Sequence, residues 1–170
     1  NHRPRVNILK PGPGVGGHCI AVDPWFLVAA SPDNAKLIRQ ARLVNDSKPD
    51  YVIAQVQAAI EGIDNPVVAC LGLAFKPDID DLRESPAIGI CERLASSGVS
   101  ILAVEPHIDE LPEALATYAK INLSDAQSAI ASANVILLLV DHSVFADLPS
   151  KASFEGKKVI DTRGQWRHRI

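Results

Sequence analysis

The chain has 170 residues, of which 47% are hydrophobic and 22% are charged, and its formal net charge is −3. This composition supplies enough apolar surface for one globular core and argues against disorder. The slightly acidic balance gives no general attraction to nucleic acid, and no apolar run is long enough to cross a membrane. Three cysteines without disulfide-framework spacing are typical of a reducing compartment. We therefore expect a cytoplasmic protein that binds neither nucleic acid nor membranes.

The first 33 residues are dense in Pro and Gly, with a short extended stretch at Val6 to Leu9, and predict an ordered loop region rather than a helix. The chain has no Met and opens on Asn1, which predicts that it is the carboxyl-terminal part of a longer protein. Two helical patterns follow at 34–45 and 49–63, separated near Pro49, where a helix can start. We expect this helical segment, 34–64, to pack against a partner subunit.

From Pro66 onward, apolar strands alternate with helices. Such near-continuous runs of Val, Ile and Leu predict a parallel sheet that is covered on both faces. The fold class is therefore α/β, with a Rossmann-like parallel sheet over 65–170. The expected strands are 67–73, 100–104, a short segment at Ile121, 135–140 and a last strand around Val159 and Ile160; the expected helices are 86–97 with Ser85 as N-cap, a weaker helix at 110–117, and a helix capped by Ser124.

The carboxyl ends of these strands are the expected ligand-binding edge, because ligands of open α/β sheets gather there. The residues that should lie at this edge are Phe75, Lys76, Glu105, Asp141, His142 and Arg163.

Gly12, Gly14 and Gly17 match the dinucleotide fingerprint G-x-G-x-x-G. The fingerprint needs a strand before it and a helix opening within it, and Pro24 argues against a helix that continues from the loop. We interpret the match as accidental. The glycines instead indicate close approach of the backbone to a bulky ligand, with Cys19 at the end of the turn.

Two segments carry a resemblance to a known family. Residues 11–23, PGPGVGGHCIAVD, resemble the catalytic loop of the UDP-glucose/GDP-mannose dehydrogenase family, and residues 72–86, GLAFKPDIDDLRESP, resemble its other signature. Both occur in the family's order with two helices between them, and the resemblance extends over essentially the whole chain. The sequence of residues 18–26 looks most like that of the branch of the family that acts on UDP-N-acetylmannosamine. The resemblance implies a UDP-binding α/β domain preceded by a catalytic loop and a helical dimerisation segment.

By this resemblance, Cys19 is the nucleophile of a double oxidation of a primary alcohol. It captures the aldehyde as a thiohemiacetal, which is oxidised to a thioester and hydrolysed, and thiolate chemistry suits these steps. Asp23 is then the carboxylate that positions or activates the water. The alternatives are that Cys19 is a small buried residue, as we assume for Cys70 and Cys91, and that Asp23 is an ordinary N-cap.

The resemblance also implies a set of binding residues. Arg83 would reach toward NAD, and Arg3 would enter the sugar site of the neighbouring subunit of a homodimer, with Arg5 as a nearby substitute. Lys76 and Arg83 have a simpler alternative as solvated cations paired with nearby aspartates. The expected contacts with the UDP-sugar are Gly14, Val15, Gly16, Gly17, Phe75, Lys76 and, with weaker support, Arg163.

A zinc site from His18, Cys19 and Asp23 is rejected, because a structural site needs four ligands and no second pair is spaced to complete it. The family also needs a lysine and an asparagine from a preceding helix, and an amino-terminal domain that binds most of the NAD. We therefore expect this chain alone to lack activity. Two other readings stay open: a nucleotide-sugar-binding and dimerisation module, or a relative that acts on UDP-glucose, UDP-N-acetylglucosamine or GDP-mannose.

Overall fold

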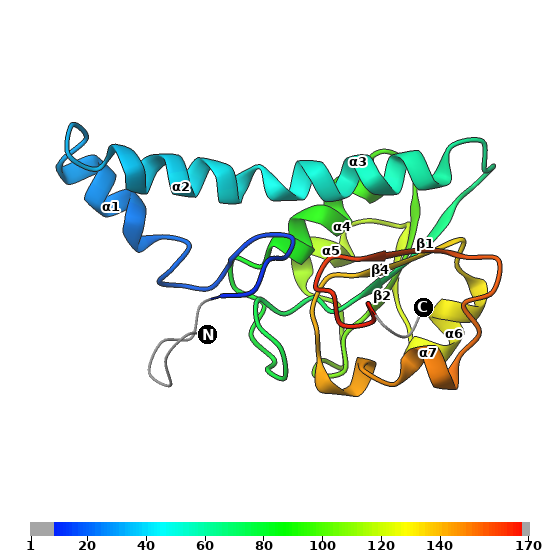
Figure 1. The fold of residues 1–170 in the computed structure, drawn as a ribbon. Helices are drawn as coiled ribbons and strands as arrows, with labels where there is room; N and C mark the ends of the chain where they lie inside the picture. The colour runs from blue at the N-terminus through cyan, green and yellow to red at the C-terminus, as the bar shows by residue number, and fades with distance from the viewer. Residues whose placement is uncertain (1–8, 168–170) are drawn as a thin grey trace.

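The structure is a computed structural model that describes residues 9–167, and it consists of an α/β domain with a helical arm (Figure 1). The elements in chain order are α1 (Asp23–Ala30), α2 (Lys36–Asp46), α3 (Lys48–Ile60), β1 (Val67–Leu71), α4 (Pro86–Ser96), β2 (Ser100–Val104), α5 (Glu113–Ala116), β3 (Ile121–Leu123), α6 (Ala126–Ser132), β4 (Val135–Leu138), the 3₁₀ helix η1 (Ser143–Phe145), α7 (Leu148–Lys151) and β5 (Lys158–Asp161).

The sheet has five strands in the order β3-β2-β1-β4-β5, and every neighbouring pair is parallel. The central strand β1 pairs with β2 from Val67 opposite Ser100 and with β4 from Val68 opposite Val135. This arrangement confirms the predicted Rossmann-like α/β fold. It also brings the ends of β1, β2 and β4 to one edge, where the predicted ligand-binding residues follow.

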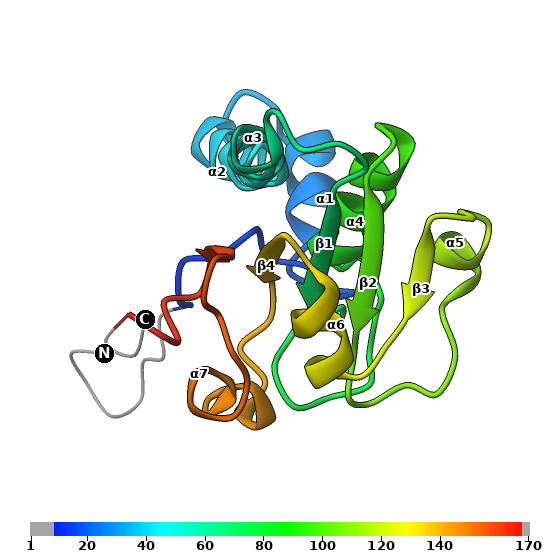
Figure 2. The same ribbon diagram turned by 90° about the vertical axis from the view of Figure 1, so that its right-hand side faces the viewer.

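Helices lie on both sides of the sheet (Figure 2). Each face of the sheet carries its own layer of core side chains, because successive residues of a strand point to opposite faces. Val68 and Cys70 of β1 face α3, α4 and α5, whereas Ala69 and Leu71 face α6 and the segment around α7. Cys70 and Cys91 are fully buried, which confirms their assignment as core residues.

The helices α2 and α3 form an almost continuous rod, but they pack differently (Figure 1). In α3, Val52, Ile53 and Val56 are buried in the core of the α/β domain. In α2 the one buried residue is Arg42. The predicted helical segment 34–64 is therefore not one packing unit: its second half belongs to the α/β domain, and its first half projects as an arm.

The prediction of a loop through residue 33 is wrong, since α1 occupies 23–30. Pro24 lies in the first turn of α1. Proline is tolerated there, because a backbone N–H at this position would have no partner within the helix. The predicted Ser124 cap is also wrong, because the Asp125 carboxylate accepts from the Ser128 amide at 2.9 Å. Ser85 caps α4 as predicted.

Several predicted bounds are shorter in the structure. The strands β1 and β4 end two residues before the predicted ends, and α5 covers only the middle of the predicted helix. The short helices η1 and α7 were not predicted.

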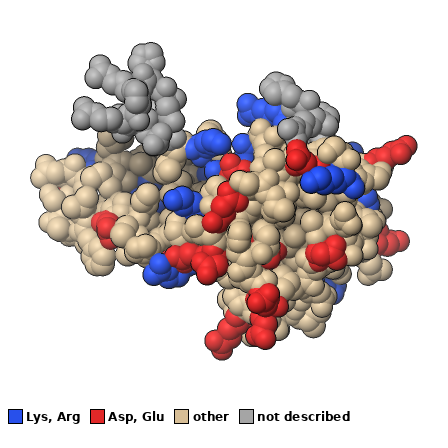
Figure 3. All heavy atoms as spheres, turned by 90° about the horizontal axis from the view of Figure 1, so that it is seen from below, with Lys and Arg blue, Asp and Glu red and all other residues tan. Residues whose placement is uncertain are grey.

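The surface mixes charges of both signs. On the face shown in Figure 3, Lys and Arg side chains lie interspersed with Asp and Glu. Within residues 9–167, no helix has both the length and the apolar character that a membrane span requires.

Candidate functional site

The glycine-rich loop that precedes Cys19 is held between two other parts of the chain. On one side, the Asn45 side chain at the end of α2 accepts from the Val15 amide at 2.8 Å. On the other side, the Gly17 amide donates to the Arg83 carbonyl at 3.2 Å. The two sequence signatures, 11–23 and 72–86, therefore meet in space and form one surface.

Two of the glycines are required by this contact. A Cβ on Gly16 would lie 2.2 Å from the Glu84 carbonyl oxygen, and one on Gly17, whose φ is +90°, would lie 2.9 Å from the Phe75 ring. Only glycine allows backbones to approach so closely. The loop thus needs its glycines for contact with its own chain. The predicted approach to a bulky ligand by Gly14, Val15, Gly16 and Gly17 stays a prediction.

Cys19 is exposed and lies in the turn that leads into α1. Its carbonyl accepts from the amides of Val22 at 3.1 Å and Asp23 at 2.8 Å. The alternative in which Cys19 is a buried core residue is therefore wrong. Asp23 is exposed and is the first residue of α1, whose N-cap is Val22, so the N-cap alternative for Asp23 is also wrong.

Arg83 belongs to the second signature and lies within electrostatic reach of Cys19. The pKa of Arg83 is raised mainly by its hydrogen bonds to Asp81, further by the charge of Asp81, and to a smaller extent by the charge of a Cys19 thiolate. The same pair holds the pKa of Asp81 at about 2. Arg83 is therefore paired with Asp81, as the alternative interpretation from the sequence predicted.

Lys76 is exposed and has no hydrogen bond or ion pair with any residue in the range 9–167, whereas Phe75 is half-buried against Gly17. The predicted pairing of Lys76 with an aspartate is not formed. Its ammonium is free to meet an anion.

Arg163 follows β5 and reaches across to the glycine loop. Its Nε donates to Asp141 at 2.8 Å, and its Nη1 donates to the Pro11 carbonyl at 3.2 Å. It therefore links the carboxyl edge of the sheet to the start of the catalytic loop. Arg3 and Arg5 lie outside the described residues.

Glu105 and His142 lie at the predicted carboxyl edge of the sheet, but their side chains do not reach the surface. Both side chains are buried, and they contact each other at 3.1 Å. Their polar atoms are used within the protein, because parallel strand ends leave backbone amides that need acceptors.

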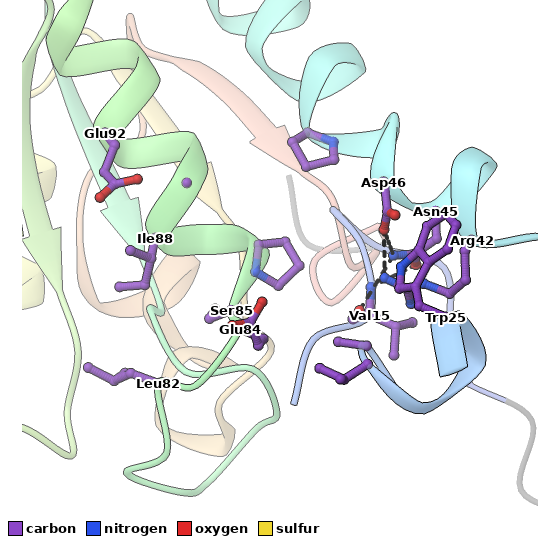
Figure 4. Close-up of a pocket in the computed structure, with 15 residues that line it drawn as sticks. Val15, Trp25, Arg42, Asn45, Asp46, Leu82, Glu84, Ser85, Ile88 and Glu92 are labelled. Carbon is purple, nitrogen blue, oxygen red and sulfur yellow. Dashed lines mark hydrogen bonds and ion pairs between the residues drawn. The ribbon is translucent and has the colours of Figure 1, made fainter. Parts of the chain in front are cut away.

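A cavity of about 600 Å³ lies between α1, the junction of α2 and α3, and the start of α4 (Figure 4). Trp25, Arg42 and Asp46 line one wall, and Glu84, Ile88 and Glu92 line the other. Cys19 is not among its lining residues. A second cavity of about 560 Å³ lies beside the glycine loop, and three of its lining residues, Lys10, Lys48 and Arg167, are cationic.

Arg42 and Asn45 are residues that the sequence analysis missed. Arg42 is buried, and it donates to the Ile20 carbonyl at 3.3 Å and to Asp46 at 2.6 Å. Together with Asn45, it fixes the chain on both sides of Cys19 from α2. An arginine and an asparagine three residues apart on one helix give no signal without knowledge of what faces them.

The described residues include one group with metal-ligand spacing. Asp78, His107 and His142 present ligand atoms within 4.8 Å of one another. His18, Cys19 and Asp23 do not belong to this group. Two of its members already use their ligand atoms in hydrogen bonds, since His142 Nδ1 accepts from the Asp78 amide and the Asp78 carboxylate accepts from Ser143.

The parallel sheet, with the exposed Lys76 and the half-buried Arg163 at its carboxyl edge, has the architecture of α/β proteins whose ligands gather at that edge. Residues 69–168 match the UDP binding domain of the UDP-glucose/GDP-mannose dehydrogenase family, and residues 1–47 match the family's central domain. The chain belongs to this family.

Curated relatives agree with this assignment. The chain is 53% identical over 98% of its length to an NDP-N-acetyl-D-galactosaminuronic acid dehydrogenase of Ralstonia nicotianae, and 51% identical over 98% to a UDP-N-acetyl-D-mannosamine dehydrogenase of Salmonella typhi. It spans only 38% and 41% of the length of these two relatives.

Solved structures are similar as well. The UDP-N-acetyl-mannosamine dehydrogenase Cap5O of Staphylococcus aureus superposes with a TM-score of 0.73 at 41% identity, over 94% of this chain and 37% of that one. A UDP-glucose dehydrogenase of Pyrobaculum islandicum gives a TM-score of 0.76 at 25% identity, over 89% of this chain and 35% of that one.

Proposed function

We propose that the protein to which this chain belongs is an NAD-dependent dehydrogenase that oxidises UDP-N-acetylmannosamine to UDP-N-acetylmannosaminuronate. The observation that carries the proposal is the exposed thiol of Cys19, held at the end of a glycine loop that packs against the second signature with Arg83 nearby. In this proposal the primary alcohol first loses a hydride and a proton to give the aldehyde. The Cys19 thiolate Sγ adds to the aldehyde carbon, and the carbonyl oxygen takes up a proton to form a thiohemiacetal, which loses a hydride and its hydroxyl proton to give a thioester. Attack of a water molecule, assisted by Asp23, breaks the C–S bond, releases the carboxylate and returns Cys19.

NAD, when bound, supplies the hydride acceptor for both oxidations. Arg83 fits the role of an NAD contact, because its side chain is 63% exposed at the rim of the site and a guanidinium suits phosphate or ribose oxygens. No dinucleotide fingerprint in the expected strand and helix context is present within residues 9–167, where the glycine loop runs into the turn at Cys19. The remaining NAD contacts are therefore assigned to the amino-terminal part of the protein.

The nucleotide sugar, in this proposal, lies along the glycine loop between Lys76 and Arg163. The neighbouring cavity of about 560 Å³ supports this placement, since its volume is in the range of ligand pockets and its cations suit a diphosphate. Phe75 and the backbone of Gly14 to Gly17 would then contact the ligand from the loop side.

A homodimer is part of the proposal. Apolar side chains are exposed on α1 and α2, and exposed apolar patches mark interaction surfaces. The residues of this apolar arm surface are Phe26, Leu27, Leu37, Ile38, Leu43 and Val44. A second copy that covers the surface would bring another catalytic loop close, and Arg3, or Arg5 in its place, would act across the interface.

The test is Cys19→Ser in the full-length protein, with Cys91→Ala as the control for loss of a thiol far from the loop. We expect uronate formation to fall by roughly a thousandfold or more in Cys19→Ser, because the covalent step is lost, while sugar binding stays within a few-fold. Cys91→Ala should retain activity. Wild-type turnover by Cys19→Ser would refute the nucleophile assignment.

Steady-state assays of the full-length protein test which nucleotide sugar is the substrate. The candidates are UDP-N-acetylmannosamine, UDP-N-acetylgalactosamine, UDP-glucose, UDP-N-acetylglucosamine and GDP-mannose. The proposal predicts the highest kcat/KM for UDP-N-acetylmannosamine. A higher kcat/KM for another sugar would contradict the proposed substrate. The assay is needed because two relatives of similar identity, 53% and 51%, carry names with different sugars.

For the chain alone, a second function is favoured by the structure of its domains. The α/β domain has a core on both faces of its sheet and the cations Lys76 and Arg163 at its carboxyl edge, and the arm carries exposed apolar side chains. The chain alone is thus proposed to act as a nucleotide-sugar-binding and dimerisation module without turnover.

A further inference from the structure

Glu105 and His142 form a buried polar pair that the proposed chemistry does not use. Glu105 follows β2 and is 4% exposed, and its Oε2 accepts from the amides of Leu73 at 2.7 Å and Ala74 at 3.0 Å. His142, which follows β4, is fully buried, and its Nε2 lies 3.1 Å from the same oxygen. The pair therefore connects the ends of β1, β2 and β4 at the start of the second signature.

The second nitrogen of His142 extends this connection into the signature. His142 Nδ1 accepts from the Asp78 amide at 2.9 Å, so the ring proton lies on Nε2 and is donated to Glu105. The Asp78 carboxylate accepts from the amide of Ser143 at 2.8 Å and from its hydroxyl at 2.6 Å. Asp78 also has a φ of +60°, which a residue other than glycine adopts only where its surroundings hold it.

This chain of hydrogen bonds ends between the two functional cations of the second signature. Lys76 lies two residues before Asp78, and Arg83 lies five residues after it. The segment has no strand or helix of its own between Ala74 and Ser85, so its course depends on contacts such as these. The amides of Leu73 and Ala74 fix its start, and the amide of Asp78 fixes its middle.

We propose that Glu105 and His142 are positioning residues, which set the course of segment 74–84 and thereby the places of Lys76 and Arg83. The proposal rests on the function proposed above for these two cations. A metal site on Asp78, His107 and His142 is a weaker explanation, because a metal ion would have to displace the hydrogen bonds at His142 Nδ1 and at the Asp78 carboxylate.

Two substitutions of His142 separate positioning from stability. In His142→Asn, the amide oxygen replaces Nδ1 and keeps the bond from the Asp78 amide, but the bond to Glu105 is lost. In His142→Gln, the amide nitrogen replaces Nε2 and keeps the bond to Glu105, but the bond from Asp78 is lost. Each variant loses one buried hydrogen bond, and His142→Asn should be the more destabilised of the two because its lost bond is to the ionised Glu105. A change of KM confined to His142→Gln would therefore not follow from lost stability.

The experiment measures kcat, the KM values for nucleotide sugar and NAD, and hydrogen exchange of segment 74–84 in the full-length protein. We expect His142→Gln to raise at least one KM by roughly three- to tenfold, which corresponds to one lost hydrogen bond, and to speed exchange of the segment. His142→Asn should stay within about twofold of the wild-type KM values and exchange rates.

Asn134→Ala is the control for a comparable loss at the opposite end of the sheet, where the Asn134 side chain accepts from the Val67 amide at 2.9 Å. It should lower the melting temperature without changing either KM. Equal KM values and equal exchange of segment 74–84 in the two His142 variants would overturn the proposal. If the wild type shows no dehydrogenase activity, the proposed function fails, and hydrogen exchange alone then decides whether His142 positions the segment.

Discussion

The helices α2 and α3 are two halves of one rod with opposite surroundings. In α3, Val52, Ile53 and Val56 are at most 6% exposed, whereas in α2 Leu37 is 81% exposed and Val44 is 48% exposed. Both helices carry apolar residues, but among residues 9–167 those of α3 are buried in a core, whereas α2 contacts α1 and the glycine-rich loop and leaves apolar side chains exposed. The difference teaches that the α/β domain stabilises α3 and that the apolar side chains of α2 are not used in the core.

The inner face of α2 has a different role from its outer face. Arg42 and Asn45 contact the chain on either side of Cys19, at Ile20 and Val15. The helix whose outer face carries the proposed association surface thus also holds the loop around Cys19. The proposed association through α2 would therefore act on the same helix that fixes the geometry of this loop.

The largest effect should separate the two halves of the rod. Ile53→Ala in α3 should lower the free energy of unfolding by about 2–5 kcal/mol, because it leaves a cavity in the core. Leu37→Ala in α2 should change the unfolding of the monomer by less than about 0.5 kcal/mol and should instead weaken self-association. Denaturant unfolding at low protein concentration, together with analytical ultracentrifugation, measures both. Equal destabilisation by the two variants would show that α2 is packed within the monomer.

A smaller effect should appear at the contact between the two signatures. Gly16→Ala should destabilise the protein by about 1–3 kcal/mol, since its Cβ would lie 2.2 Å from a backbone oxygen that cannot move alone. Gly89→Ala is the matched control, because Gly89 is inside α4 with no atom within 4 Å of the added Cβ, and it should stabilise the helix by about 0.5–1 kcal/mol. Thermal unfolding of both variants measures whether each change lowers or raises stability. An unchanged melting temperature in Gly16→Ala would mean that the two signature segments are not in close contact.

A third effect concerns acid stability of the carboxyl edge. Burial alone would raise the pKa of Glu105, but hydrogen bonds from His142 and from the amides of Leu73 and Ala74 outweigh burial and lower the pKa below its ordinary value of 4.5. A lowered pKa means that the stabilisation is present above 4.5 and is lost as the pH falls through the folded-state pKa. Unfolding measured from pH 7 to pH 3 should therefore depend on pH less steeply below 4.5 in Glu105→Gln than in the wild type. Identical pH dependence in the two proteins would argue against an ionised Glu105.

Much of the fold was predictable, because the strands are nearly continuous apolar runs and Ser85 is a strong helix start. The helix α1 was missed for a physical reason: Pro24 was treated as a barrier, although proline is well tolerated in the first turn. The hydrophobic pattern could not distinguish the exposed helix α2 from the packed helix α3, since the exposure of Leu37 depends on which other elements of the fold contact α2.

The site was only partly predictable. The two signatures singled out Cys19, Phe75, Lys76 and Arg83 as candidates, and the strand ends predicted the position of Arg163 at the carboxyl edge; the roles of these residues stay predictions. The inward direction of Glu105 and His142 was not predictable, because the same residue types at a sheet edge serve either a ligand or the amides of neighbouring strand ends. Arg42 and Asn45 were missed because their partners are backbone groups of residues far away in the sequence.

We propose that this chain carries the part of the protein that binds the nucleotide sugar and not the part that binds most of the NAD. Calorimetric titration of the 170-residue chain with UDP and, separately, with NAD tests it most directly. The cations at the carboxyl edge and beside the glycine loop predict weak but measurable binding of UDP and hardly any binding of NAD. Tighter binding of NAD than of UDP would contradict the account, because it would assign the sheet edge to the other ligand.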